Sequence, residues 1–138
     1  MKKILIIIVC LGLTYIVITS FKLHSYLTAR DKYPTDLGDC IQKYKSDWGK
    51  PCAGCTSTRD TYVVSLKNSC DLPLDIKIAV QNKNKTWRIF EKENFGGGDS
   101  LIVFSCEGTG KYLKWTKKAG DREIVFPSNM EIGKTYNK

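Results

Sequence analysis

Cysteines are the residues of this 138-residue chain whose type and spacing most clearly predict chemistry. Six are present, and Cys10 lies inside an apolar N-terminal run. The other five are Cys40, Cys52, Cys55, Cys70 and Cys106. Because five is odd, at least one thiol must be free, paired with another chain or bound to a ligand. A short exported domain with a modest core gains from covalent cross-links, so we expect most of these cysteines to form disulfides.

The expected strand directions narrow the choice of disulfide partners. If the strands simply alternate in direction, Cys70 and Cys106 lie at opposite ends of the fold. A strand of about six residues spans roughly 20 Å, whereas the Cα atoms of a disulfide lie about 4.4–6.8 Å apart. We therefore predict that one of Cys52 and Cys55 pairs with Cys106 and that the other pairs with Cys40. Cys70 is then the odd thiol. Connections that cross between two sheets would reverse this pairing.

Three interpretations compete for the Cys52-Ala-Gly-Cys55 sequence. The favoured one is structural, with one or both cysteines joined to other parts of the domain. A thiol-disulfide oxidoreductase would need a lowered thiol pKa, and neither a helix nor a βαβ pattern follows Cys55 to supply it. A zinc-stabilised module would use Cys40, Cys52, Cys55 and Cys106, but the second Cys-x-x-Cys half-site is missing. We predict no cofactor and no metal, and keep both alternatives open.

Other catalytic patterns fail on residue type or context. The single histidine, His24, lies next to the apolar run, which excludes Ser-His and Cys-His hydrolases from the rest of the chain. Two carboxylate pairs, Glu91 with Glu93 and Asp121 with Glu123, are typical of solvated strand ends. A third pattern, Gly108-Thr-Gly-Lys111, lacks the leading glycine and the final Ser or Thr of a phosphate-binding loop. We predict no catalytic residue and a protein that is not an enzyme.

Aromatic residues interleaved with lysines form the candidate ligand patch, which consists of Trp48, Tyr112 and Lys114. Such a patch, if exposed, would stack a sugar ring or grip a peptide. We expect Trp87 and Ile89, and likewise Leu113 and Trp115, to face the core instead. Addition of a partner's strand to an exposed sheet edge is the alternative mode of binding.

The positive charge does not indicate a nucleic-acid partner. The formal charge is +8, but omission of Lys2, Lys3, Lys22 and Arg30 leaves 18 basic and 14 acidic residues, a charge of +4 from residue 31 onward. No nucleic-acid-binding motif accompanies it, so we expect no such partner. Lysine greatly outnumbers arginine, which favours a bacterial source.

The N-terminal residues predict a membrane partner. Residues 4–21 are 18 uncharged, mainly apolar residues, just enough to span a bilayer of roughly 30 Å and longer than most signal-peptide cores. A good cleavage site is missing, so we favour a retained anchor over a cleaved signal. We divide the chain into a signal-anchor (1–22), a juxtamembrane tether (23–38) and an exported β domain (39–138). Lys2 and Lys3 favour a cytoplasmic N-terminus, with the bulk facing the periplasm or exterior.

Runs of β-branched, aromatic and other apolar residues predict strands throughout the exported part. Residues 61–67 and 74–80 are expected to form a β-hairpin around a turn-forming segment. Further strands are expected at 86–90, 100–106, 111–116 and 122–126, with 100–106 the most central one and 107–110 a tight turn. A short helix is expected within 39–50, because Ile41, Tyr44 and Trp48 have helical spacing. About six strands at ten-residue spacing predict an all-β fold, a small antiparallel sandwich or barrel.

The combined evidence favours a non-enzymatic function. We expect a membrane-tethered exported β-sandwich domain that binds a protein or a cell-envelope glycan, or serves a structural role.

Overall fold

The fold was analysed in a computed structural model that describes residues 36–137. The predicted anchor, and most of the tether, therefore lie outside the described residues. Within residues 36–137, no helix combines the length and the hydrophobicity that a bilayer crossing requires.

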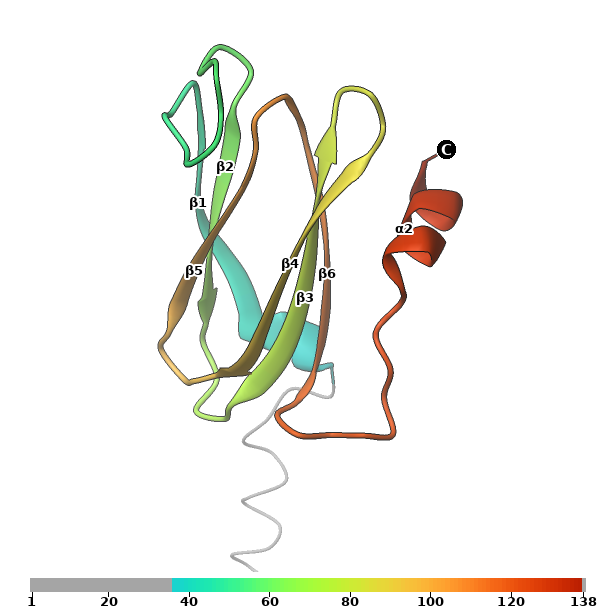
Figure 1. Cartoon of the computed structure of the whole chain (residues 1–138). Coiled ribbons are helices and arrows are strands. Elements are labelled where there is room, and N and C mark those ends of the chain that lie inside the picture. Colours follow the sequence, from blue (N-terminus) through green and yellow to red (C-terminus); the bar gives the residue numbers. More distant parts are fainter. Residues whose placement is uncertain (1–35, 138) are drawn as a thin grey trace, which may run out of the picture. The chain divides into compact units, whose positions relative to one another are not determined.

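Six antiparallel strands form two three-stranded sheets that pack together as a sandwich-like fold (Figure 1). Sheet A has the order β1-β2-β5, and sheet B has the order β4-β3-β6. The strands are β1 (Ile41–Trp48), β2 (Tyr62–Asn68), β3 (Leu74–Asn82), β4 (Trp87–Phe95), β5 (Ser100–Ser105) and β6 (Gly108–Lys118). A 3₁₀ turn, η1 (Leu37–Cys40), precedes them, and one helix, α2 (Asn129–Tyr136), follows. The described part of the chain is thus mostly β, as the alternation predicts.

The central strand of each sheet supplies most of the core between the sheets. In β3, Leu74, Ile76, Ile78 and Val80 are buried on one face, the alternation expected of a strand with one core-facing side. Buried residues of β2, including Val64 and Leu66, pack against the same cluster. The core between the two sheets is thus built mainly from β2 and β3.

The outer face of sheet B is also buried, because the C-terminal segment covers it. Lys77 and Ala79 of β3 point to this face, and both are buried. Ile132 of α2 is fully buried, the Trp87 indole Nε1 donates a hydrogen bond to Asn137 Oδ1 at 2.7 Å, and the rings of Trp115 and Tyr136 lie 5.9 Å apart. Sheet B therefore lies between two apolar layers.

This second layer corrects the expectation for four large side chains. Across sheet B, Lys77 is paired with Trp115, Ala79 with both Ile89 and Leu113, and Gln81 with Trp87. Directly paired residues share a face, so the four large side chains face α2 and not the inter-sheet core. They are Trp87, Ile89, Leu113 and Trp115.

The expected hairpin between β2 and β3 is wrong, because the connection crosses from sheet A to sheet B. Asn68 organises this crossing. Its side chain is fully buried and donates through Nδ2 to Leu72 O and to Phe95 O, each at 2.9 Å, while its Oδ1 accepts from Cys70 N at 3.1 Å. A buried amide with satisfied donors and acceptor fixes a backbone path that apolar alternation alone does not specify.

Four further assignments also differ from expectation. Residues 41–48 form β1 and not a helix, and a register shift between Lys43 and Lys45 interrupts the alternation there. β5 is an edge strand and not the most central strand, and its Ile102 is 60% exposed. Residues 122–126 form no strand, and residues 108–110, expected as a turn, begin β6.

Candidate binding surface and sulfur cluster

Two disulfides lie at opposite ends of the sandwich. Cys40 is bonded to Cys70 and Cys55 to Cys106, with Cα atoms 5.2 and 5.3 Å apart, and Cys52 is the free thiol among the described residues. Of the two partners expected for Cys106, the structure therefore selects Cys55. The expectations that Cys40 pairs with the remaining cysteine, Cys52, and that Cys70 is the odd thiol are both wrong. Two disulfides indicate an oxidising, extracytoplasmic environment.

The Cys40–Cys70 bond follows from β1 being a strand. Ile41 of β1 is paired with Asn68 of β2, so the residues just outside these two positions lie side by side. Ser69 N donates to Cys40 O at 2.8 Å, and the Ser69 hydroxyl donates to the same oxygen at 3.0 Å. With residues 39–50 assigned as a helix, this proximity could not be foreseen.

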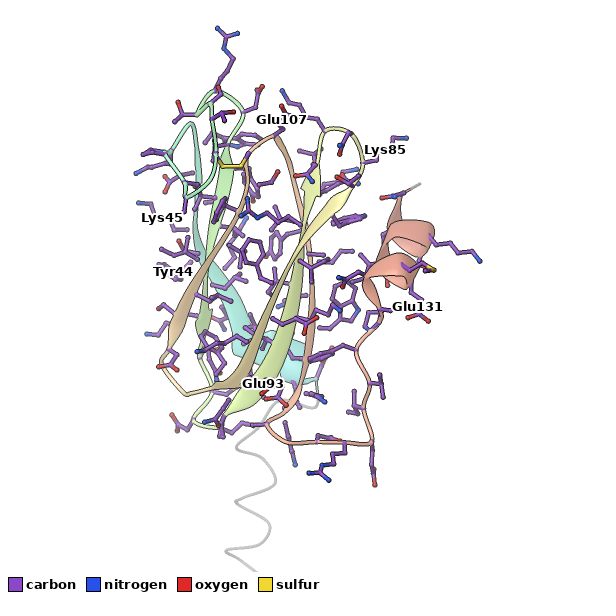
Figure 2. The ribbon with its side chains drawn as sticks, viewed as in Figure 1. Tyr44, Lys45, Lys85, Glu93, Glu107 and Glu131 are labelled. Carbon is purple, nitrogen blue, oxygen red and sulfur yellow. A yellow bond between two sulfur atoms is a disulfide. The ribbon has the colours of Figure 1, made fainter. Side chains whose placement is uncertain are left out.

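The Cys55–Cys106 bond closes the opposite end, where the β1–β2 loop meets the β5–β6 turn. Figure 2 shows it as the yellow bond near Glu107. Cys55 N donates to Cys52 O at 3.1 Å, so the Cys-x-x-Cys sequence forms a tight turn that keeps Cys52 close to the disulfide. Cys52 and Cys55 are therefore not bonded to each other.

A guanidinium group lies beside these sulfur atoms. Arg88 Nη1 donates to Cys106 Sγ at 3.5 Å, and Arg88 Cζ lies 4.0 Å from the centroid of Phe104 and 5.5 Å from that of Phe90. Burial raises the pKa of the Cys52 thiol, and the nearby positive charge of Arg88 partly opposes that increase. Cys52, Cys55, Cys106 and Arg88 are called the sulfur cluster below.

The sulfur cluster bears on the two alternative functions. A raised thiol pKa lowers the thiolate fraction, which is the opposite of what a redox nucleophile needs. The zinc alternative requires four thiolates, whereas Cys40, Cys55 and Cys106 are in disulfides. Within residues 36–137, no group of three or more histidine, cysteine or carboxylate side chains could hold a metal ion.

Trp48 is the most prominent candidate for ligand contact. Its side chain is 54% exposed, and its ring packs on the 4% exposed ring of Tyr62 with centroids 4.9 Å apart and planes at 46°. Gly110 lies close to the Trp48 indole near Cζ2: a Cβ atom added at Gly110 would lie 3.2 Å from that atom. The indole is thus held in one orientation while part of its surface faces solvent.

The two other residues of the predicted patch behave differently. Tyr112 packs partly buried against the core, and burial together with the neighbouring Tyr62 raises its pKa. The ammonium group of Lys114 donates to Gly38 O and to Ile41 O, both at 2.6 Å, so it ties η1 to β6. We define the aromatic patch as Trp48, Tyr62, Gly110 and Tyr112. The contacts of Gly110 and Tyr62 with Trp48 were not recognised from the sequence.

Charged residues lie near Trp48 in the sequence. The Asp47 carboxylate oxygen lies 3.4 Å from Lys45 Nζ and 3.9 Å from Lys50 Nζ. Tyr44 and Lys45 project away from the sandwich beside β1 (Figure 2). Because adjacent residues of a strand point to opposite faces, the Asp47 side chain lies on the face of β1 opposite the Trp48 indole.

The remaining residues singled out from the sequence have structural partners. Glu91 forms an ion pair with the buried Lys77 at 2.8 Å, and the Asp121 carboxylate accepts from the backbone N–H groups of Glu123 and Ile124, which lowers its pKa. These contacts explain the residues as parts of turns and of sheet B.

Comparison with models of protein families, with curated proteins and with solved structures gives no match for this chain. The function must therefore be inferred from the geometry of the aromatic patch and of the sulfur cluster.

Proposed function

We propose that this protein is a non-enzymatic, exported binding domain, tethered to the cytoplasmic membrane through residues 4–21, that recognises a cell-envelope glycan on its aromatic patch. The observation that carries the proposal is the fixed and exposed indole of Trp48, supported by Tyr62 and Gly110. An aromatic ring that is already ordered loses little conformational entropy on binding, and its apolar face complements the apolar face of a sugar ring.

The small size of the aromatic patch supports a glycan ligand. Trp48 is the largely exposed ring of this patch, and one indole matches the apolar face of a single sugar ring. A protein partner would more commonly require a larger apolar patch.

The shape of β1 argues against the alternative of strand addition at this edge. Its register shift lies between two lysines, Lys43 and Lys45, and bulges and edge lysines are features that oppose pairing with another strand. The membrane tether remains part of the proposal, and the oxidising environment indicated by the two disulfides supports export.

Binding of the purified, oxidised full-length chain to insoluble peptidoglycan and to envelope polysaccharides tests the proposal. We expect wild type to bind one of these glycans. Trp48→Ala should lower the affinity for that glycan by about tenfold or by a larger factor, whereas Trp48→Phe should retain part of the affinity. Tyr44→Ala is the matched control, because Tyr44 is exposed on the same strand but lies outside the patch. Equal binding by wild type and Trp48→Ala, or capture of a protein with no glycan binding, would contradict it.

A further inference from the structure

We propose that Arg88 forms a second binding site, specific for a carboxylate group, in the hollow at the disulfide-bonded end of β4 and β5. The hollow has a volume of about 440 Å³. Its lining residues are Asn82, Asn84, Trp87, Arg88, Cys106 and Glu107. None of them belongs to the aromatic patch, so this inference is independent of the glycan proposal.

Aromatic rings hold the Arg88 guanidinium in place. Its central carbon lies 4.0 Å from the Phe104 ring centroid and 5.5 Å from that of Phe90, and these two rings are themselves 5.7 Å apart. A guanidinium over aromatic faces is oriented by the ring quadrupoles and by the packing of its aliphatic stem. The charged group is therefore positioned before any ligand arrives.

The hydrogen-bonding capacity of Arg88 is mostly unused. A guanidinium has five N–H donors, and the structure gives Arg88 one side-chain hydrogen bond, to Cys106 Sγ at 3.5 Å. Disulfide sulfur is a weak acceptor. Within residues 36–137, no carboxylate lies within ion-pair distance of Arg88. A partly buried cation without a counter-ion is costly, so an external anion would be bound favourably.

The lining residues select the type of anion. A carboxylate matches the planar fork of arginine in a bidentate pair. Glu107 also lines the hollow, and its negative charge would repel a phosphate dianion more strongly than a carboxylate monoanion. The shared chemistry is therefore a carboxylate group, supplied by a uronic acid or by a peptide C-terminus.

Calorimetric titration of the oxidised full-length chain with five probes tests the site and its source. The carboxylate probes are glucuronate and N-acetyl-alanyl-alanine, and the neutral counterparts are glucose and N-acetyl-alanyl-alanine amide. We expect at least one carboxylate probe to bind about tenfold more tightly than its neutral counterpart, and inorganic phosphate to bind no more tightly than that probe. Whichever carboxylate probe binds identifies the source. Equal affinity for charged and neutral probes, or tightest binding by phosphate, would overturn the proposal.

Two substitutions locate the binding in this hollow. Arg88→Gln should weaken carboxylate binding about tenfold, and Glu107→Gln should strengthen it because a repulsive charge is removed. Arg122→Gln is the matched control, an exposed arginine in the segment after β6 that should leave affinity unchanged. If Arg88→Gln fails to fold, Glu107→Gln decides: unchanged or weaker affinity in that variant would refute the site. Trp48→Ala should leave carboxylate binding unchanged, which separates this result from the glycan test.

Discussion

Gly108 and Gly110 hold the aromatic patch together through close contacts that no other residue could make. A Cβ atom added at Gly108 would lie 2.4 Å from Tyr62 Cβ, far inside van der Waals contact. At Gly110, φ is +84° and an added Cβ would meet the Trp48 indole. The orientation of Trp48 and Tyr62 thus depends on two positions without side chains.

We predict that Gly108→Ala is strongly destabilising. Because β6 cannot move away from Tyr62 without disrupting its pairing with β3, the clash should lower the free energy of unfolding by about 1–3 kcal/mol or more. Urea denaturation followed by tryptophan fluorescence measures the change. Gly54→Ala is the control, since its φ of +79° costs about 1 kcal/mol but its added Cβ has no atom within 4 Å. Equal losses in the two variants would show that packing on Tyr62 is unimportant.

Arg88 and Cys52 give a prediction about pH dependence. Burial raises the Cys52 pKa and the charge of Arg88 partly offsets this, so Arg88→Gln should raise the pKa further. The thiolate fraction at a given pH near 8 should fall, and alkylation by iodoacetamide should slow accordingly. The pH profile of alkylation, read by intact mass, measures the displacement toward higher pH. A profile that stays fixed or moves to lower pH in Arg88→Gln would show that the guanidinium does not act on this thiol.

Among the elements, α2 is short but covers the outer face of sheet B. Ser128 and Glu131 form a reciprocal capping box at its N-terminus, with Ser128 N donating to Glu131 Oε2 at 2.7 Å. Its single fully buried residue, Ile132, packs over the outer face of sheet B. The helix is the cover that allows Lys77 and Ala79 to be buried on a face that would otherwise be exposed.

We predict that Ile132→Ala lowers the free energy of unfolding by about 2–5 kcal/mol, because it removes a buried side chain and leaves a cavity beneath α2. Met130→Ala in the same helix should change it by less than about 0.5 kcal/mol, since Met130 is 83% exposed. Thermal unfolding of both variants provides the comparison. A loss in Ile132→Ala no greater than that in Met130→Ala would mean that α2 does not contribute to the stability of sheet B.

β5 is an edge strand without the features that protect β1. Its sequence, Ser-Leu-Ile-Val-Phe-Ser, contains no charge and no proline, and Ile102 is 60% exposed. We predict that Ile102→Lys reduces aggregation at high concentration with little change in stability, because a charge on an exposed edge opposes pairing between chains. Light scattering at matched concentrations tests this. The control is Lys67→Gln on β2, an exposed position away from the sheet edge, and equal scattering by Ile102→Lys and wild type would refute the prediction.

The elements also show which parts of the fold could be predicted from the sequence. β2, β3, β4, β5 and β6 are recognisable because each contains a run of β-branched, aromatic or other apolar residues, which alternates clearly in β3. β1 was missed because the register shift at Tyr44 resets the alternation and leaves Ile41, Tyr44 and Trp48 at helical spacing. Because β1 was not predicted as a strand, the Cys40–Cys70 pairing could not be predicted either. Residues 122–126 have strand-like composition, yet Ile124 and Val125 are exposed and no strand forms.

The candidate site was recognised only in part for a similar reason. Trp48 could be identified from residue type. Whether Lys114 is available to a ligand depends on backbone oxygens of Gly38 in η1 and of Ile41 in β1, seventy or more residues earlier in the chain. The position of Arg88 beside Cys106 depends on contact between edge strands of different sheets. Local periodicity carries no information about such distant contacts, so these features emerge only from the assembled fold.

For the whole molecule, the two disulfides fasten opposite ends of one sandwich. The Cys40–Cys70 bond joins the start of β1 to the end of β2, and the Cys55–Cys106 bond joins the loop before β2 to the end of β5. Sheet A is therefore cross-linked at both ends, while sheet B is held by the core and by α2. Loss of the disulfides should act first on the position of the β1–β2 loop and hence on Trp48.

We predict that replacing either pair by serines is strongly destabilising. With sequence separations of 30 and 51 residues, the chain-entropy model gives about 3.5 kcal/mol for Cys40–Cys70 and about 4 kcal/mol for Cys55–Cys106. Their sum approaches the total stability of about 5–15 kcal/mol of a typical domain, so the fully reduced protein should be largely unfolded at 37 °C. Urea denaturation of each double-serine variant, and of wild type with and without dithiothreitol, measures this. Cys52→Ser should behave as oxidised wild type, because Cys52 takes part in neither bond. A reduced protein that keeps its cooperative unfolding transition and its near-ultraviolet circular dichroism would show that the two sheets need no covalent cross-links and would remove the main support for an oxidising compartment.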